Sequence, residues 1–165
     1  MESGKRDLST VVIRRCSSRL SLDGLLSVIG KANEAQCVAQ VFDPEMVINR
    51  THLLGAYLNA INSFDSGNNA AKNVGMEMLL FAAMTRQISD AIKLVGAKSS
   101  KDFILFACDD KTMMRMKKCI SHSEDAVFTG KHVEQLLRNY KVIVPKGGDA
   151  EQFLLQKMTM SALDR

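Results

Sequence analysis

The chain has 165 residues and a mass of 18.2 kDa, which suits one domain. Hydrophobic residues make up 46% and charged residues 24%, so a disordered, collagen-like or coiled-coil chain is excluded. The sequence has no apolar run of membrane-spanning length and begins with a polar segment, so we expect a cytoplasmic protein with no membrane partner. The formal net charge of +4 permits nucleic acid or an acidic protein as partner and requires neither.

The first third of the chain alternates strands with helix signals. We predict a strand over 8–16, a helix that starts after Ser21, a strand over 37–42 and a helix start at Asp43-Pro44-Glu45. The helix prediction rests on apolar residues at i, i+3, i+4 and i+7, namely Leu22, Leu25, Leu26 and Ile29.

The middle third is helical by the same pattern. We predict a helix over 51–64 with an apolar stripe of Leu54, Tyr57, Leu58 and Ile61, a loop over 65–73, and a helix over 76–83 that is buried on most sides. Thr85 is a candidate N-cap for the next helix. Its predicted buried face consists of Ile88, Ala91, Ile92 and Val95, and Gly96 is its expected end.

The last third begins with a bulky apolar strand over 102–108, followed by a helix capped by Asp109 or Asp110. Thr129 is expected to cap another helix, with Val133, Leu136, Leu137 and Tyr140 on its apolar face. A short strand over 141–144 and a C-terminal helix over 149–160 complete the chain. The elements together indicate a mixed α and β class in one domain.

No motif for catalysis, phosphate binding or metal binding is present. The chain lacks a P-loop, a dinucleotide-binding glycine motif and a nucleophile elbow, and its cysteines form no CxxC pair. The three histidines lie far apart, and His52, in the first turn of a helix, is expected to be structural. We therefore predict no catalytic residue, no metal and no cofactor.

Basic residues give two candidate binding surfaces. Lys111, Arg115 and Lys118 follow a helical spacing and are interpreted as a solvated face. Arg86 lies at the junction of two predicted helices, beside Thr85 and Gln87. Backbone donors at a helix start together with a guanidinium suit a phosphate group.

The middle third also resembles a known family. The resemblance spans about 45 residues and rests on the ordered elements His52-Leu53, Ala56, Ala60, Lys72, Glu77, Leu79-Leu80, Arg86-Gln87-Ile88, Ala91-Ile92 and Gly96. The family is the small kinase-binding subunit of the KEOPS complex, called the PRPK-binding protein, or TPRKB, in animals. This chain resembles its archaeal type.

The resemblance implies a non-catalytic regulatory subunit that binds and supports a RIO-like atypical kinase. The complex makes threonylcarbamoyladenosine in tRNA, and archaeal members also bind the single-stranded tRNA 3′ CCA end. The implied RNA-binding residues here are Lys72, Met84, Thr85, Arg86 and Gln87. The family often has glycine where this chain has Met84. Glycine would let RNA backbone approach closely, whereas methionine offers a base an apolar face.

We therefore expect an α+β fold: a single compact domain over 1–165, with a small, mostly antiparallel sheet of about four strands flanked by six to eight helices. Two alternatives to the tRNA-docking kinase partner stay open. One is a pure protein-interaction adaptor that does not bind RNA, and the other is a small enzyme with an unrecognised site.

Overall fold

The computed structural model describes residues 7–35, 37–128 and 133–163. A four-stranded sheet has the order β2-β3-β1-β4, and every neighbouring pair is antiparallel. The strands are β1 (Val12–Ser17), β2 (Ala39–Phe42), β3 (Phe103–Ala107) and β4 (His122–Asp125). The described helices are α1 (Leu22–Glu34), α2 (Arg50–Asp65), α3 (Val74–Ala82), α4 (Ile88–Val95), α5 (Asp110–Met116), α6 (Val133–Asn139) and α7 (Ala150–Leu163). The expected α+β class with a mostly antiparallel sheet is confirmed.

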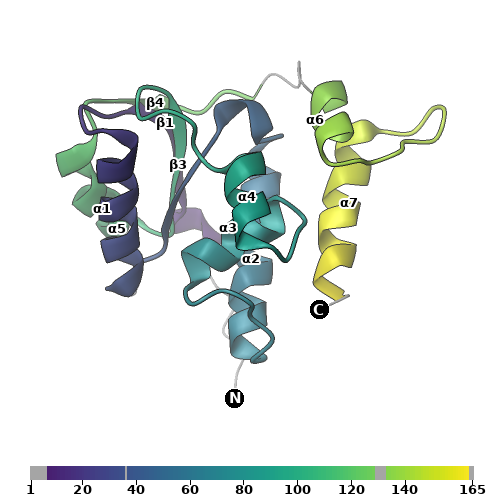
Figure 1. Ribbon diagram of the computed structural model, residues 1–165, viewed down its shortest axis with the longest axis horizontal. Helices are drawn as coiled ribbons and strands as arrows, with labels where there is room; N and C mark the ends of the chain where they lie inside the picture. Colours follow the sequence, from purple (N-terminus) through teal and green to yellow (C-terminus); the bar gives the residue numbers. More distant parts are fainter. Residues whose placement is uncertain (1–6, 36, 129–132, 164–165) are drawn as a thin grey trace.

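The helices cover both faces of the sheet. In Figure 1, α1 and α5 lie on the left of the sheet, α2, α3 and α4 lie on the right, and α6 and α7 form a further layer beyond them. α7 packs against α2, α3 and α6, so the last helix closes the right-hand side of the molecule.

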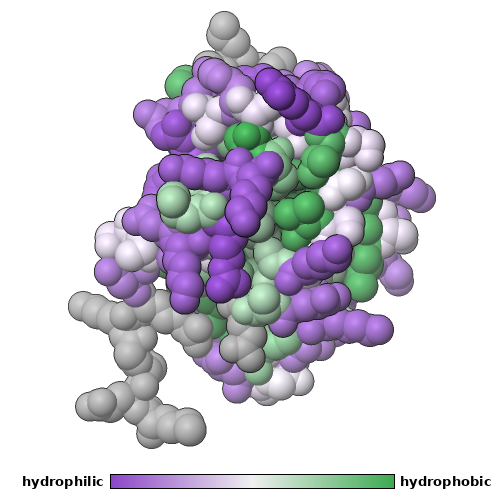
Figure 2. Space-filling model, turned by 90° about the vertical axis from the view of Figure 1, so that its left-hand side faces the viewer, coloured by the Kyte–Doolittle hydropathy of each residue, from purple (hydrophilic) through white to green (hydrophobic). Residues whose placement is uncertain are grey.

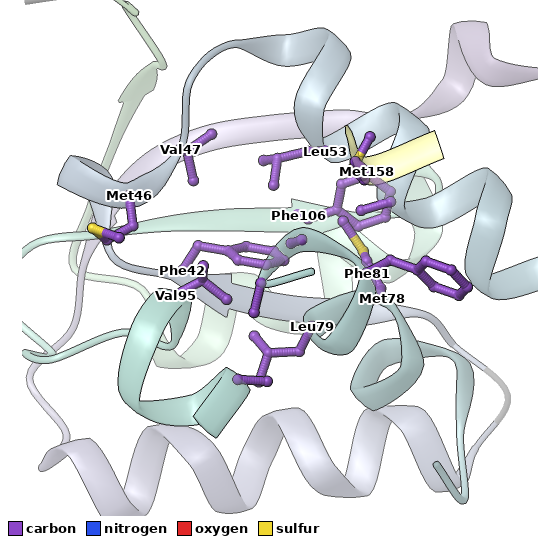
Figure 3. Close-up of a cluster of buried hydrophobic side chains, with 14 of the residues drawn as sticks. Phe42, Met46, Val47, Leu53, Met78, Leu79, Phe81, Val95, Phe106 and Met158 are labelled. Carbon is purple, nitrogen blue, oxygen red and sulfur yellow. The ribbon is translucent and has the colours of Figure 1, made fainter. Parts of the chain in front are cut away.

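β3 is the central element of the packing because it contributes to both faces. Its five residues are all buried, as the continuous apolar run 103–107 predicted. Phe103 and Leu105 belong to a small core beneath α1 and α5, whereas Ile104 and Phe106 belong to the larger core beneath the other helices. The larger core contains five more phenylalanine and methionine side chains that Figure 3 labels: Phe42, Met46, Met78, Phe81 and Met158.

Two of the predicted helix starts are confirmed, whereas the helix after α3 is preceded by Gln87 and not by Thr85. The side chains of Ser21 and Asp109 each accept a hydrogen bond from a backbone N–H in the first turn of α1 and α5. Asp43 caps a helical turn with Pro44 at its first position, but that turn is a single 3-10 turn over Pro44–Met46. The predicted cap at Thr129 lies outside the described residues.

One predicted strand is absent, and another begins later than predicted. Residues 141–144 form no strand, and the fourth strand is instead β4, which is polar and mostly exposed. β4 is an edge strand with few apolar residues, so its sequence lacks the alternation of apolar and polar residues by which strands are predicted. β1 begins at Val12 because Asp7 caps a short 3-10 turn over Leu8–Thr10.

The predicted buried stripes of α2 and α4 were also partly wrong. α2 buries Leu53, Ala56, Ala60 and Ile61 because it packs against α3 and α7, and its predicted Leu54, Tyr57 and Leu58 are only partly buried. α4 packs chiefly on α3 through Ala91 and Val95. Ile88 and Ile92 on α4 remain 41% and 45% exposed.

Candidate nucleic-acid interface

The predicted RNA-binding residues lie mainly in the connection between α3 and α4. α3 ends in a Schellman motif, in which Met84 N–H donates to the Phe81 carbonyl (3.0 Å) and Thr85 N–H donates to the Leu80 carbonyl (3.1 Å). Met84 occupies the left-handed position of this motif, with φ of 54°. Only glycine reaches that conformation without steric cost, so the turn itself favours glycine over Met84 at this position.

His52 holds the same end of α3 from the start of α2. Its ring is buried, with 1% of the residue exposed, and Nε2 lies 3.0 Å from the Ala82 carbonyl oxygen. The Ile48 N–H donates to Nδ1 (3.3 Å), which places the ring proton on Nε2. Burial lowers the pKa of His52 to about 4. The prediction that this histidine is structural therefore agrees with its surroundings.

The residues after the turn are open to solvent. Thr85 Oγ1 accepts a hydrogen bond from the Gln87 N–H (3.2 Å), and α4 begins at Ile88 rather than directly after Thr85. Gln87 is the N-cap residue of α4 and makes no side-chain cap hydrogen bond. Arg86 thus lies in the loop ahead of α4, and its side chain is exposed.

Arg86 differs from the arginines of β1. Arg15 forms a bidentate pair with Asp102, both contacts being 2.7 Å, and Arg14 pairs with Asp125. Within the part of the chain that the structure describes, Arg86 has no hydrogen bond or ion pair. Its guanidinium is therefore available to an anion, and no described carboxylate holds it in place.

Lys72 is separated from the other predicted RNA-binding residues. It precedes α3, whereas Met84, Thr85, Arg86 and Gln87 follow that helix. The nine residues of α3 put about 13 Å of helix length between the two groups. A single bound nucleotide would not contact both groups, but an extended strand of a few nucleotides has the length to do so.

A buried carboxylate fixes the loop that carries Lys72. Glu77 is fully buried and accepts hydrogen bonds from the N–H groups of Ala70 (3.0 Å) and Ala71 (2.7 Å). The Ser63 hydroxyl donates to the same carboxylate (3.3 Å). The sequence indicated Glu77 only as part of the family pattern. Its structural role could not be predicted, because its hydrogen-bond partners are backbone N–H groups of the preceding loop.

A second surface feature is apolar. Leu26 on α1 and Ile92 on α4 are 40% and 45% exposed, and both line a cavity of about 170 Å³ between α1, β2, α3 and α4. Figure 2, which faces the side where α1 and α5 lie, shows hydrophobic side chains at the surface between hydrophilic ones. The structure therefore leaves apolar side chains of two helices in contact with solvent.

The described residues contain no cluster of three or more His, Cys, Asp and Glu side chains suited to a metal ion. Across the same residues, no helix is both long and apolar enough to cross a bilayer.

Comparison with known proteins identifies the family. Residues 22–162 match the family described as "Kinase binding protein CGI-121". The chain belongs to this family.

Two curated archaeal proteins are similar to parts of the chain. One is the "KEOPS complex subunit Cgi121" of Pyrococcus abyssi, which is 43% identical over 51 residues, or 31% of this chain and 30% of the relative. The other is the "Regulatory protein Cgi121" of Methanocaldococcus jannaschii, which is 33% identical over 76 residues, or 46% of this chain and 48% of the relative. The alignments thus span less than half of each relative.

Proposed function

We propose that this protein is a non-catalytic, regulatory subunit of a KEOPS complex. As a single domain, it binds and supports a RIO-like kinase subunit and docks the tRNA 3′ CCA end for threonylcarbamoyladenosine modification. The observation that carries the proposal is the match of residues 22–162 to a kinase-binding family. The names of the two archaeal relatives, one a KEOPS subunit and one a regulatory protein, support the same role.

We propose the exposed apolar face of α1 and α4, defined by Leu26, Ile88 and Ile92, as the kinase-binding surface. The adjoining cavity of about 170 Å³ has room for one large side chain of a partner. Gly30, in the interior of α1, lines the same cavity, and a Cβ built there meets no atom within 4 Å. Glycine weakens a helix interior relative to alanine, so its presence without internal crowding favours close approach by a partner.

Co-purification with the kinase of the same organism tests this part. Wild-type protein should retain the kinase through size-exclusion chromatography. Ile92→Asp should lose it while staying folded, because Ile92 is already 45% exposed. Ile143→Asp is the matched control, since Ile143 is 91% exposed and lies outside this surface. Kinase binding that Ile92→Asp leaves intact would refute the surface, and no binding by wild type would refute the kinase role.

The tRNA-docking part rests on the α3–α4 connection. Its exposed Arg86 has no described ion-pair partner, and the start of α4 lacks a side-chain cap, so both can bind a phosphate group. The protein has few aromatic residues, at 5%, which favours recognition by phosphate and backbone contacts over a stacking platform.

A gel shift with tRNA that has or lacks its 3′ CCA end tests this part. Binding should need the CCA end and should weaken as salt is added. Arg86→Glu should reduce affinity about ten-fold, the loss of one charged hydrogen bond, whereas the exposed Lys118→Glu should change it little. Equal affinity for both tRNAs, or a folded Arg86→Glu variant that binds as wild type does, would leave the adaptor role without RNA binding as the better account.

The enzyme alternative is tested with the isolated protein. We expect no hydrolysis of ATP or GTP and no stoichiometric metal. Turnover that co-purifies with the wild-type protein through two different columns would contradict the non-catalytic role.

A further inference from the structure

We infer that His52 is a positioning residue for the Thr85–Gln87 loop: its imidazole sets the direction in which the chain leaves α3. The inference rests on the proposed function, because that function makes this loop the tRNA-docking element. His52 itself lies in the first turn of α2 and is buried, so it cannot touch RNA directly. It acts through the backbone of Ala82, the last residue of α3.

The end of α3 has carbonyl groups that the helix itself does not bind. The last four carbonyls of any α-helix lack intrahelical donors and need partners from elsewhere. The turn supplies donors for Leu80 and Phe81 through the N–H groups of Thr85 and Met84. The carbonyl of Ala82 is bound from outside by His52 Nε2–H at 3.0 Å. Removing that donor leaves a buried carbonyl without this bond, next to the residue that enters the left-handed turn.

The imidazole is itself held in a fixed orientation. The Ile48 N–H donates to Nδ1 of the ring (3.3 Å), and the Asn49 side chain holds the backbone at the same point by accepting from the His52 backbone N–H (2.8 Å). The Tyr140 ring packs edge-on against it at a centroid distance of 6.3 Å. Tyr140 is anchored in turn, because its hydroxyl donates to the Met46 carbonyl (3.1 Å). The donor that fixes the loop is thus part of a packed network with one ring tautomer.

Three variants separate positioning from general stability. His52→Leu keeps an apolar side chain of similar size and removes the donor. His52→Gln restores an N–H donor of similar reach. Ile61→Ala is the control, because Ile61 is buried near the opposite end of α2 and its truncation destabilises without removing a bond to Ala82.

The first measurement is hydrogen exchange at the amides of Met84 and Thr85, which needs no RNA. His52→Leu should raise their exchange about ten-fold relative to the rest of α3, and His52→Gln should restore it. Ile61→Ala should raise exchange at the Met84 and Thr85 amides no more than at the other amides of α3. Unchanged local protection in His52→Leu would overturn the inference, even if wild type proved unable to bind tRNA.

The second measurement is tRNA affinity of the folded variants. His52→Leu should bind about ten-fold more weakly, and both His52→Gln and Ile61→Ala should bind nearly as wild type does. A folded His52→Leu protein with wild-type affinity would overturn the positioning role. Failure of the wild type to bind tRNA would instead refute the docking function, and hydrogen exchange would still decide whether His52 fixes the loop.

Discussion

At the residue scale, His52 makes the stability of the fold depend on pH. Burial lowers its pKa from 6.5 to about 4, so the unfolded chain takes up the proton first as pH falls. The contribution of His52 is complete above about pH 6.5 and is lost progressively down to about pH 4. The shift corresponds to roughly 3 kcal/mol of unfolding free energy.

Urea unfolding of wild type and His52→Gln at pH 7 and pH 4.5 checks this expectation. Wild type should lose more stability than the variant between the two values, because glutamine does not titrate. The same loss in both proteins would assign the pH dependence to other groups.

At position 84, glycine should give a more stable protein than alanine, the reverse of the usual order inside a helix. The Met84 φ of 54° is strained for any side chain with a Cβ, so Met84→Gly should be more stable than Met84→Ala by about 1 kcal/mol. Ser27, exposed in the interior of α1, is the control: there the alanine variant should be the more stable of the two. Thermal melts of the four proteins give the comparison, and an alanine advantage at position 84 would show that the turn is not left-handed in solution.

At the element scale, two glycines that line the same cavity, Gly30 and Gly96, should respond oppositely to substitution. Gly30→Ala should raise the unfolding free energy by about 0.5–1 kcal/mol, because α1 gains helix propensity and the space is open. Gly96→Ala should lower it, because the new Cβ would lie 2.6 Å from the Ile92 carbonyl oxygen. Chemical unfolding of both variants measures the pair, and a destabilising Gly30→Ala would show that Gly30 is needed inside the molecule.

The elements that sequence reasoning found are those whose own residues determine them. The apolar runs of β3 and α3 and the Ser21 cap of α1 need no distant partner to be recognised. The exposure of Ile88 and Ile92 depends on which face of α4 packs against α3. The spacing of apolar residues along the sequence does not determine that packing. The candidate site divides in the same way. Arg86, Thr85 and Gln87 were found from their place at a predicted helix junction, and Lys72 and Met84 from the family pattern. The left-handed turn and the role of His52 depend on contacts between helices, which neither kind of reasoning contains.

At the scale of the whole molecule, β3 couples the two cores. Leu25 belongs to the small core and Leu154 to the large one, and each is 1% exposed. Because β3 contributes side chains to both cores, we expect them to unfold together. Leu25→Ala and Leu154→Ala should each cost roughly 2–5 kcal/mol and shift one common transition. Calorimetry checks this, and two separated transitions in either variant would show that the layers unfold independently.

The hydrogen bonds that fix the C-terminal end of α3 also affect the entropy cost of binding a partner at the following loop. Ordering the backbone of a flexible residue costs about 1–2 kcal/mol in entropy, and a mobile loop would lose that amount for each residue when it docks. Here the backbone amides of Met84, Thr85 and Gln87 are already hydrogen-bonded in the free protein. Most of this entropy is thus lost during folding, before any partner arrives. For the proposed docking of tRNA at this loop, association should accordingly be fast and not limited by a conformational change.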